Sequence, residues 1–363
     1  VFGLCKVSKD LYNQALFLVK DTLNKEDRFL FYNELEPIMK ELPNLDNEVN
    51  YRKLKAQVAQ QTLKSLDKNV IAYIKAIKDW SKHKEKYNGM PKFPKFMPKN
   101  GYRQLIYTNQ SCSIKNGHIN LSKTLKIVIP QWDKYKDKLS TFQQVRINPK
   151  KDNCYEVEII YLINDCQFID NNAVASIDLG VDNLVTIVSS EFKPLLYSGK
   201  QVKTMNQYFN KTIAYLKSAL EKCNKKKSSK RINELCEKRD RQIEDVFHKI
   251  SRDIVNRCIA HKVSTIIVGY NSGWKDSINI GRRNNQTFVM IPYDKLIRYL
   301  EYKCMMSGIR VVIQEESYTS KCDSLSLEEI CKHEEYLGKR IKRGLYQSSQ
   351  GKLINADVNG AMN

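Results

Sequence analysis

The sequence predicts a mixed α/β protein, in which an all-helical part and a small all-β part precede a larger α/β part. Three patterns predict this fold class. Apolar residues recur at three- and four-residue spacing through residues 1–90, which is typical of amphipathic helices. Apolar and polar residues alternate in residues 102–168, as they do in half-buried strands. From residue 173 onward, apolar β-branched runs alternate with helical segments.

The helical part, residues 1–90, contains the segments LYNQALFLV, FLFYNELEPIMKEL and VNYRKLKAQVAQQTLKSLDKNVIAYIKAIKDW. The last of these runs into a basic stretch, where Pro91, Pro94 and Pro98 break the helix. We therefore place the first domain boundary between 1–90 and 91–172. The start of the chain indicates an amphipathic helix, because it lacks the basic segment and the cleavage site of a signal peptide.

The β part is expected to be mostly antiparallel. The strongest local signal is a hairpin from Ser113 to Leu121 around Asn116-Gly117, a dipeptide typical of two-residue hairpin turns. The Lys, Arg and Tyr residues of this part fit a nucleic-acid-binding face and ordinary solvated strand faces equally well.

The α/β part begins with AVASIDLGVDNLVTIVSS at 173–190, which predicts two apolar strands joined by a turn. A charged helical region of about 200–260 follows, then the buried strand VSTIIVG, a helix of about 292–307 and the strand IRVVIQEE. The basic run KKKSSKR at 225–231 indicates a turn between two helices, with a nuclear import signal as the alternative. The last 47 residues are polar and basic.

The composition points to a polyanionic partner. The chain has 363 residues and a formal net charge of +21, and the positive charges are spread along its whole length. Nucleic acid is the first candidate partner and a membrane surface the second. We expect no transmembrane span, because no run of about 18 apolar residues exists.

The cysteines and histidines exclude other classes of protein. The ten cysteines form no CxxC pair and are irregularly spaced, so we expect no disulfide framework and an intracellular location. The five histidines form no triad with a nucleophile, which disfavours a hydrolase of the serine or cysteine type.

Four acidic residues are candidate metal ligands in this basic chain. Asp178 lies in the apolar strand VASID, where a charge is costly unless it is paired or bound to metal; the alternative is a strand-end Asp that caps a turn. Glu315 and Glu316 end the strand IRVVIQEE, and adjacent acids point to opposite faces; the alternative is simple solvation. Asp357 follows Asn355, either of which could open a helix, so its alternative is a capping role.

Three motifs of residues 173–363 resemble one known family. SIDLGVDNLVTI resembles the first RuvC-like nuclease motif of TnpB (OrfB) proteins, which are transposon-associated relatives of type V CRISPR effectors. YTSKC at 318–322 resembles the start of that family's zinc-ribbon segment, and NADVNGAMN resembles its third nuclease motif. Residues 1–172 resemble the family by layout alone.

The resemblance implies an RNA-guided DNA endonuclease. It implies a helical recognition domain (1–90), a β-barrel wedge domain (91–172) and an RNase H-like nuclease domain (173–363) with a degenerate zinc-ribbon-like insertion at about 317–354. It also implies a guide RNA and target double-stranded DNA as partners, a short target-adjacent motif, and two Mg²⁺ or Mn²⁺ ions. No protein oligomer is required. The location would be the bacterial cytoplasm or nucleoid, or the nucleus if the chain is a eukaryotic Fanzor.

By resemblance, Asp178 and Asp357 take the first and third carboxylate positions. The second is usually a Glu that ends the central strand, but Gly269 stands there. Some relatives, including many Fanzors, carry a relocated Glu on the following strand. Glu315 is our first candidate for this ligand and Glu316 is the reserve.

The zinc pattern of the family is incomplete here. Cys322 is present, but Leu325 stands where its partner would be, and Ser348 and Ser349 replace the second pair. We expect no zinc, since Cys322, Cys331 and His333 are weak candidates whose spacing matches no structural zinc site.

Two basic segments are candidate nucleic-acid contacts, with solvated loops as the alternative. The loop WKDSINIGRRNNQ contributes Trp274, Arg282 and Arg283, and GKRIKRGLY contributes Lys339, Arg340, Lys342 and Arg343. Because Gly269 replaces the usual Glu, a nuclease-dead RNA-guided DNA-binding repressor is the main alternative function. A plain RNA-binding or transposase-accessory protein is a third possibility.

Overall fold

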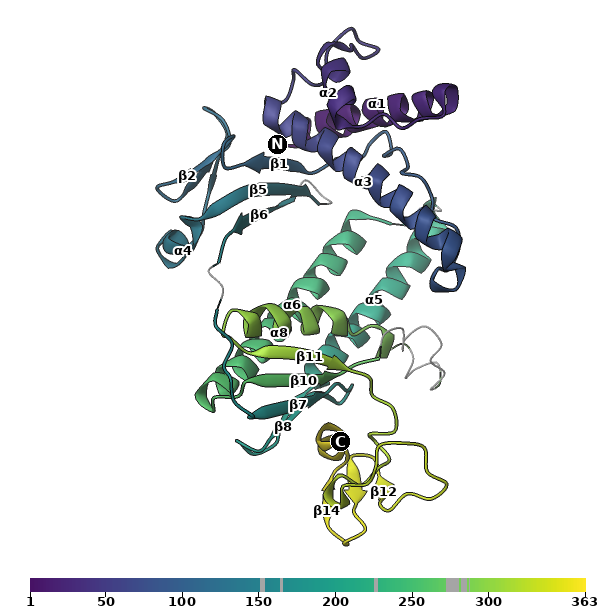
Figure 1. The fold of residues 1–363 in the computed structure, drawn as a ribbon, viewed down its shortest axis with the longest axis vertical. Helices are drawn as coiled ribbons and strands as arrows, with labels where there is room; N and C mark the ends of the chain where they lie inside the picture. Colours follow the sequence, from purple (N-terminus) through teal and green to yellow (C-terminus); the bar gives the residue numbers. More distant parts are fainter. Residues whose placement is uncertain (151–153, 164–165, 225–227, 272–280, 282–285, 287) are drawn as a thin grey trace. The chain divides into compact units, whose positions relative to one another are not determined.

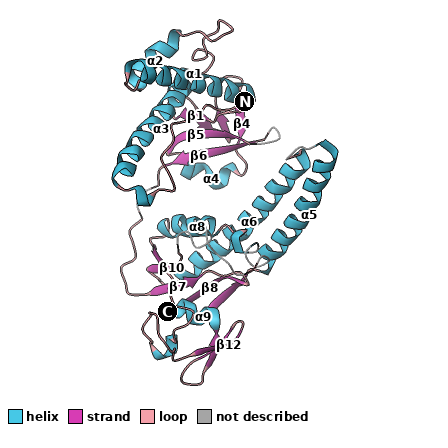
Figure 2. Cartoon of the chain, turned by 90° about the vertical axis from the view of Figure 1, so that its right-hand side faces the viewer, coloured by secondary structure: helices cyan, strands magenta, loops and turns pink. Residues whose placement is uncertain are grey.

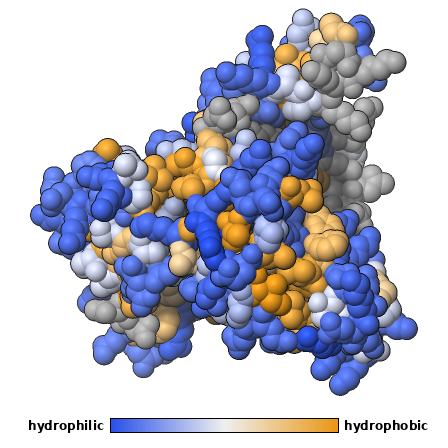
Figure 3. All heavy atoms as spheres, turned by 90° about the horizontal axis from the view of Figure 1, so that it is seen from above, coloured by the Kyte–Doolittle hydropathy of each residue, from blue (hydrophilic) through white to orange (hydrophobic). Residues whose placement is uncertain are grey.

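The chain folds into two compact units, residues 1–164 and 165–363, in the computed structural model (Figure 1). The structure describes residues 1–150, 154–163, 166–224, 228–271 and 288–363, together with 281 and 286. The face seen in Figure 3 is mostly hydrophilic, with hydrophobic residues in several separate groups. No helix among the described residues is long and apolar enough to cross a membrane.

The first unit combines helices and strands around one hydrophobic core. Its helices are α1 (Phe2–Glu26), α2 (Tyr32–Glu41), α3 (Ala56–Lys82), the 3-10 turn η1 (Lys84–Lys86) and α4 (Trp132–Leu139). Its strands are β1 (Leu105–Thr108), β2 (Ser113–Lys115), β3 (His118–Asn120), β4 (Lys126–Val128), β5 (Phe142–Pro149) and β6 (Tyr155–Tyr161).

Residues on both sides of the predicted boundary at 90/91 belong to that core. Leu11 of α1, Leu63 of α3 and Leu105 of β1 are completely buried in it, and α3 packs against both α1 and β1. The predicted helices of residues 1–90 are thus confirmed, and they are packed on the β part.

The β part forms two small antiparallel sheets, β1-β5-β6 and β2-β3-β4. The predicted hairpin is confirmed, because Asn116 and Gly117 join β2 to β3 with φ angles of 49° and 74°, as a type I′ turn requires. The expected barrel is not closed within the described residues. The strands of the second sheet have three residues each and pair only with one another, so they do not close the first sheet.

The second unit is built on a five-stranded sheet of order β11-β10-β7-β8-β9 (Figures 1 and 2). Its strands are β7 (Val174–Asp178), β8 (Asn183–Ser189), β9 (Leu195–Ser198), β10 (Thr265–Gly269) and β11 (Arg310–Gln314). β11, β10 and β7 are parallel, and β8 and β9 are antiparallel to their neighbours. Counted within the unit the order is 3-2-1-4-5, which is that of an RNase H-like sheet, as the resemblance implies.

Helices cover both faces of this sheet. The long pair α5 (Lys200–Asn224) and α6 (Lys230–Ala260) confirms the predicted helical region, and α8 (Tyr293–Met305) confirms the next one. α6 and α8 share a core with the sheet, in which Phe247, Ile266 and Leu296 are completely buried. The short helix α9 (Ala356–Met362) packs against β7 and β8, where Val188 and Val358 form a separate apolar contact.

The segment between β11 and α9 adds a third small sheet. It contains the 3-10 turn η2 (Ser324–Ser326) and the antiparallel strands β12 (Lys339–Lys342), β13 (Leu345–Gln347) and β14 (Leu353–Asn355). Asn355 then caps α9, because its side-chain oxygen accepts hydrogen bonds from the backbone N–H groups of Asp357 and Val358.

Candidate functional site

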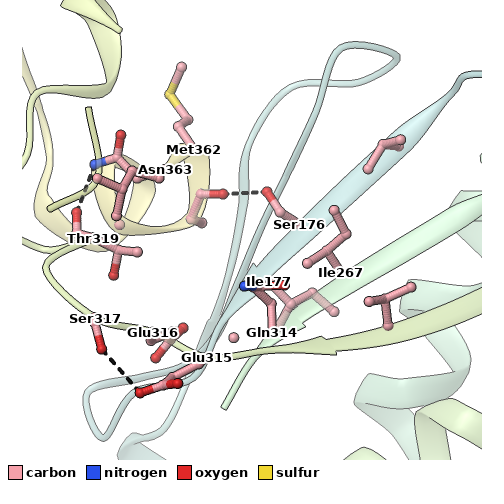
Figure 4. Close-up of a pocket in the computed structure, with 16 residues that line it drawn as sticks. Ser176, Ile177, Ile267, Gln314, Glu315, Glu316, Ser317, Thr319, Met362 and Asn363 are labelled. Atoms are coloured by element: carbon pink, nitrogen blue, oxygen red, sulfur yellow. Dashed lines mark hydrogen bonds between the residues drawn. The ribbon is translucent and has the colours of Figure 1, made fainter. Parts of the chain in front are cut away.

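Three acidic residues lie at the edge of the sheet where β7 and β11 end. Asp178 is the last residue of β7, Glu316 follows β11, and Asp357 lies in the first turn of α9. Because β7, β10 and β11 are parallel, their carboxyl ends lie at the same edge, which brings residues far apart in sequence together. A pocket of about 690 Å³, lined in part by Glu316, Gly269 and Gly360, opens beside them (Figure 4).

Asp178 and Glu316 are hydrogen-bonded to each other through their carboxyl groups. Burial raises the pKa of both carboxyls. The pKa of Asp178 rises to about 6, because the charge of Asp357 adds to the effect of burial while the hydrogen bond from Glu316 opposes it. The pKa of Glu316 rises to about 8, because the Asp178 carboxylate adds to the effect of burial. Two carboxyls in contact cannot both be ionised cheaply, so the pair shares a proton near neutral pH. Such a pair is an acceptor for a divalent cation, which would replace that proton.

Gly269 makes the space that Glu316 occupies. A Cβ atom placed on Gly269 would lie 1.7 Å from Oε1 of Glu316, closer than any real contact. Gly269 stands where the family usually has a Glu. Because it has no side chain, it leaves room for the carboxyl group of Glu316, which follows the neighbouring strand.

Glu316 is held in place by Asn271, which sequence reasoning did not identify. The Asn271 side chain donates from Nδ2 to the carbonyl of Glu316 at 2.9 Å and accepts from its N–H at 2.7 Å. This pair of bonds continues the pairing of β10 with β11 by one step. Glu315 is exposed instead, and accepts a hydrogen bond from Ser317 Oγ at 3.3 Å (Figure 4). The structure thus brings the reserve candidate Glu316 to Asp178, whereas Glu315 is exposed on the wall of the pocket.

Asp357 is oriented by Asn183, the first residue of β8. Nδ2 of Asn183 donates to Oδ2 of Asp357 at 2.7 Å. The negative charge of Asp357 contributes to the raised pKa of Asp178, so the two carboxyls interact. Three residues further along α9, a Cβ atom on Gly360 would lie 3.7 Å from Oδ2 of Asp178, so one face of the helix lies beside this carboxyl.

The turn that follows Asp178 is fixed from two sides. Tyr293 at the start of α8 is completely buried and donates from its hydroxyl to the carbonyl of Gly180 at 2.8 Å. Asp182 forms ion pairs with Lys203 at 2.9 Å and with Arg343. These contacts, which no local pattern in the sequence predicts, stabilise the backbone that carries Asp178.

Within the described part of the chain, no three His, Cys, Asp or Glu side chains lie close enough to hold one ion. At this site, Asp178 and Glu316 are hydrogen-bonded to each other, while Asp357 accepts a hydrogen bond from Asn183. The donor set nevertheless fits a hard divalent cation, since all three groups are carboxyls and the pKa values of Asp178 and Glu316 are raised by burial and by a neighbouring carboxylate.

The three zinc candidates lie near one another in the segment after β11. Sγ of Cys331 is 3.3 Å from Nε2 of His333, and the buried thiol of Cys322 faces the carbonyl of Glu329 at 3.4 Å. Hydrogen bonds to two acids hold the segment. Asp323 accepts from the N–H and hydroxyl of Ser349 at 2.7 and 3.0 Å, and Glu328 accepts from the N–H of Asp323 at 2.7 Å.

Four of the seven predicted nucleic-acid contacts lie among the described residues. Lys339, Arg340 and Lys342 are exposed on β12, and the charge of Arg340 acts to lower the pKa of Asp178. Arg343 is exposed and ion-paired with Asp182. Trp274, Arg282 and Arg283 lie outside the described residues.

Two protein-family models match separate parts of the chain. Residues 154–275 match the family model OrfB_IS605, described as a probable transposase, and residues 293–363 match the model of the Cas12f1-like TNB domain. Together the two matches cover more than half of the chain. The chain belongs to the OrfB (TnpB-like) family. The resemblance inferred from the motifs is thereby confirmed, while the link to Fanzors through a relocated Glu stays a prediction.

One relative of this OrfB chain is the TnpB-like protein ORF457 of Acidianus two-tailed virus. It is 27% identical over 201 residues, a match that spans 53% of this chain and 41% of the viral protein. Two solved structures are similar to the whole chain. A Cas12f1–sgRNA–target DNA complex has a TM-score of 0.38 and 16% identity, covering 100% of this chain and 92% of that one. A CRISPR–Cas12f ternary complex has a TM-score of 0.40 and 14% identity, covering 99% and 79%.

Proposed function

We propose that this chain is an RNA-guided DNA endonuclease whose cleavage centre is formed by Asp178, Glu316 and Asp357. The observation that carries the proposal is that Asp178 is hydrogen-bonded to Glu316 and interacts electrostatically with Asp357, although the three acids come from separate elements of a chain with a net charge of +21. Buried acids that lie beside one another are costly to ionise together unless a cation compensates their charge.

Mg²⁺ or Mn²⁺ is the cation that these oxygen ligands would hold. When bound, two such ions supply an activated water and neutralise the leaving 3′ oxygen of the cleaved strand. The chain's own residues place the ligands: Asn271 fixes the backbone of Glu316, Asn183 orients the carboxyl of Asp357, and Tyr293 holds the turn after Asp178. Positioning partners of this kind keep a metal site ready for its ions.

The proposed partners are a guide RNA and a target double-stranded DNA. Base pairing with the RNA would select the target, while the protein would contact phosphates and a short target-adjacent motif. The exposed Lys339, Arg340 and Lys342 of β12 fit phosphate contacts near the centre. Residues 1–90 would serve as the recognition domain and residues 91–172 as the wedge domain. The proposed location is inside the cell, and no protein oligomer is needed.

Cleavage of a matched target tests the proposal. The chain is purified with its bound RNA, the RNA is sequenced, and a plasmid library is built that carries the complement of its variable end beside randomised bases. We expect the wild-type complex to cut members of this library in Mg²⁺ and not in EDTA. Asp178→Ala should lower the cutting rate by more than about 100-fold, since losing a ligand costs more than losing a partner of a ligand.

Two results would contradict the nuclease assignment. If the wild-type complex binds the target but cuts no more than Asp178→Ala, the chain is a nuclease-dead RNA-guided DNA binder. If the bound RNA is a random sample of cellular RNA, guided targeting fails altogether.

A further inference from the structure

Helix α5 presents a row of exposed side chains on the side opposite its core contacts. Its buried residues Val202 and Asn206 and its half-buried Phe209 and Ile213 lie toward α6 and the sheet. Six residues at alternating four- and three-residue spacing are all exposed, and we call them the outer row: Thr204, Tyr208, Lys211, Tyr215, Ser218 and Lys222. In Figure 2, α5 is the outer helix of its pair, with α6 between it and α8.

Two large aromatic rings stand out in the outer row. Tyr208 is 65% exposed and Tyr215 is 73% exposed, among the highest values for aromatic residues of the described chain. They are seven residues apart, so the rings project from the same side of the helix about 10 Å apart, with Lys211 between them. Exposed aromatic rings with interleaved lysines are the arrangement on which unpaired bases stack while the cations contact phosphates.

The charge of α5 indicates an anionic partner. The helix contains five lysines and a single acidic residue, Glu221. A protein partner is disfavoured because protein interfaces are depleted in lysine and serine, which make up half of the outer row. Nucleic acid is the partner whose chemistry matches both the rings and the charges.

The direction of the row separates it from the cleavage centre. Lys203 contacts Asp182 in the turn after Asp178, so its side of the helix faces that centre. At about 100° per residue, Tyr208 and Tyr215 are turned from Lys203 by about 140° and 120°. A DNA strand in the carboxyl centre would lie on the Lys203 side of α5. A ligand of the outer row would lie on a different side of the helix and would not occupy the centre.

We propose that the outer row of α5 binds unpaired nucleotides of the guide RNA, with Tyr208 and Tyr215 stacking on bases and Lys211 contacting phosphate. This inference rests on the proposed function for the identity of the RNA. It assigns to one helix a permanent RNA contact that does not depend on cleavage.

The test measures RNA binding in the Asp178→Ala background, so that cleavage plays no part. The probe is the RNA extracted from the purified complex and labelled with a fluorophore, and affinity is followed by anisotropy. Tyr208→Ala and Tyr215→Ala should each weaken binding by between about 5- and 150-fold. The double Tyr→Phe variant should bind as the parent does, because a phenyl ring stacks equally well. Gln207→Ala, an exposed neighbour off the row, is the matched control.

Other outcomes overturn the inference. Equal RNA affinity of the Tyr→Ala variants and the control would show that the row does not bind RNA. If these variants bind RNA normally but the RNA-loaded protein binds target DNA more weakly, the row is a DNA surface. Equal melting temperatures of the Ala and Phe variants check that folding is intact. Because RNA affinity is the readout, loss in the Ala variants supports the inference even if the wild-type complex proves unable to cut DNA.

Discussion

Glu316 lies against Asp178, and its neighbour Glu315 lies in solvent. The sequence predicted that one of the two would join the centre, because adjacent strand residues point to opposite sides. It could not select between them, since the selection depends on Gly269 in another strand and on the two hydrogen bonds that the Asn271 side chain makes with the backbone of Glu316. The strand runs on for two residues beyond the paired region, and only tertiary contacts show where each side chain then points.

The shared proton of Asp178 and Glu316 predicts a stability that depends on pH. The folded-state pKa of Glu316 is raised from 4.5 to about 8, so its contribution is fully present at low pH and is lost as the pH rises toward 8. Glu316→Gln keeps the neutral form at every pH. In EDTA, we expect the melting temperatures of wild type and variant to agree near pH 5 and the variant to be more stable by about 2 °C or more at pH 8.

At high pH, Mg²⁺ should make the wild type melt at a higher temperature than Glu316→Gln. The ion binds and stabilises the deprotonated wild-type centre, whereas the centre of the variant lacks one ligand. Thermal unfolding followed by circular dichroism at both pH values, with and without Mg²⁺, gives the four curves needed. Parallel behaviour of wild type and variant across the pH range would contradict the shared-proton arrangement.

At the scale of elements, the pairing of β10 with β11 decides which strand supplies the second carboxyl. A Cβ atom on Gly269 would lie 2.3 Å from Cδ of Glu316, so a short acid at position 269 would place its carboxyl close to the same spot. Gly269→Ala alone should abolish cleavage by forcing Glu316 away. Glu316→Ala should also abolish cleavage, and adding Gly269→Asp to it should restore a measurable part.

The control for this exchange is Glu316→Ala with Gly269→Asn, which has the same shape as the Asp variant but no carboxylate. Rates of target cleavage in Mg²⁺ are compared for all four variants. Full activity of Gly269→Ala, or equal recovery by Asp and Asn, would mean that the position does not carry the ligand.

Most elements could be predicted from the sequence, because their signals are local. The apolar spacing gave the helices of residues 1–90, the Asn116-Gly117 turn gave the hairpin, and the β-branched runs gave β7, β8 and β10. The short helix α4 and the strand β9 were missed, since eight and four residues carry little periodicity. The strands of the expected barrel do not form a closed barrel within the described residues, and closure is not predictable from local signals because it depends on pairing between strands far apart in sequence.

The candidate site shows the same division between local and distant signals. Asp178 and Asp357 stand in recognisable motifs, and Asn355 was foreseen as a possible helix cap. Asn183 and Tyr293 are ordinary residues in their own segments. Asn183 is 174 positions from Asp357 along the chain, and Tyr293 is 113 positions from Gly180. They act on the centre only because the fold brings these distant residues into contact.

At the scale of the whole molecule, the net charge of +21 predicts salt-dependent RNA binding. Each phosphate contact releases condensed counterions, so the affinity for the extracted RNA should fall by about 10³-fold or more between 50 and 200 mM salt. Lys339→Ala with Lys342→Ala removes two exposed cations of β12, and should lower the slope of log affinity against log salt by about 2. A tenfold or smaller change for the wild-type chain would indicate that its charge serves another purpose.

The comparison of Glu316→Gln with Glu315→Gln tests the composition of the centre most directly. The two variants make the same chemical change at adjacent positions, one in contact with Asp178 and one in solvent. In Mg²⁺, with the RNA-loaded complex and its matched target, Glu316→Gln should lower the cleavage rate by more than about 100-fold, and Glu315→Gln should leave it within about twofold of wild type. Loss of cleavage in Glu315→Gln with retention in Glu316→Gln would contradict the centre proposed here.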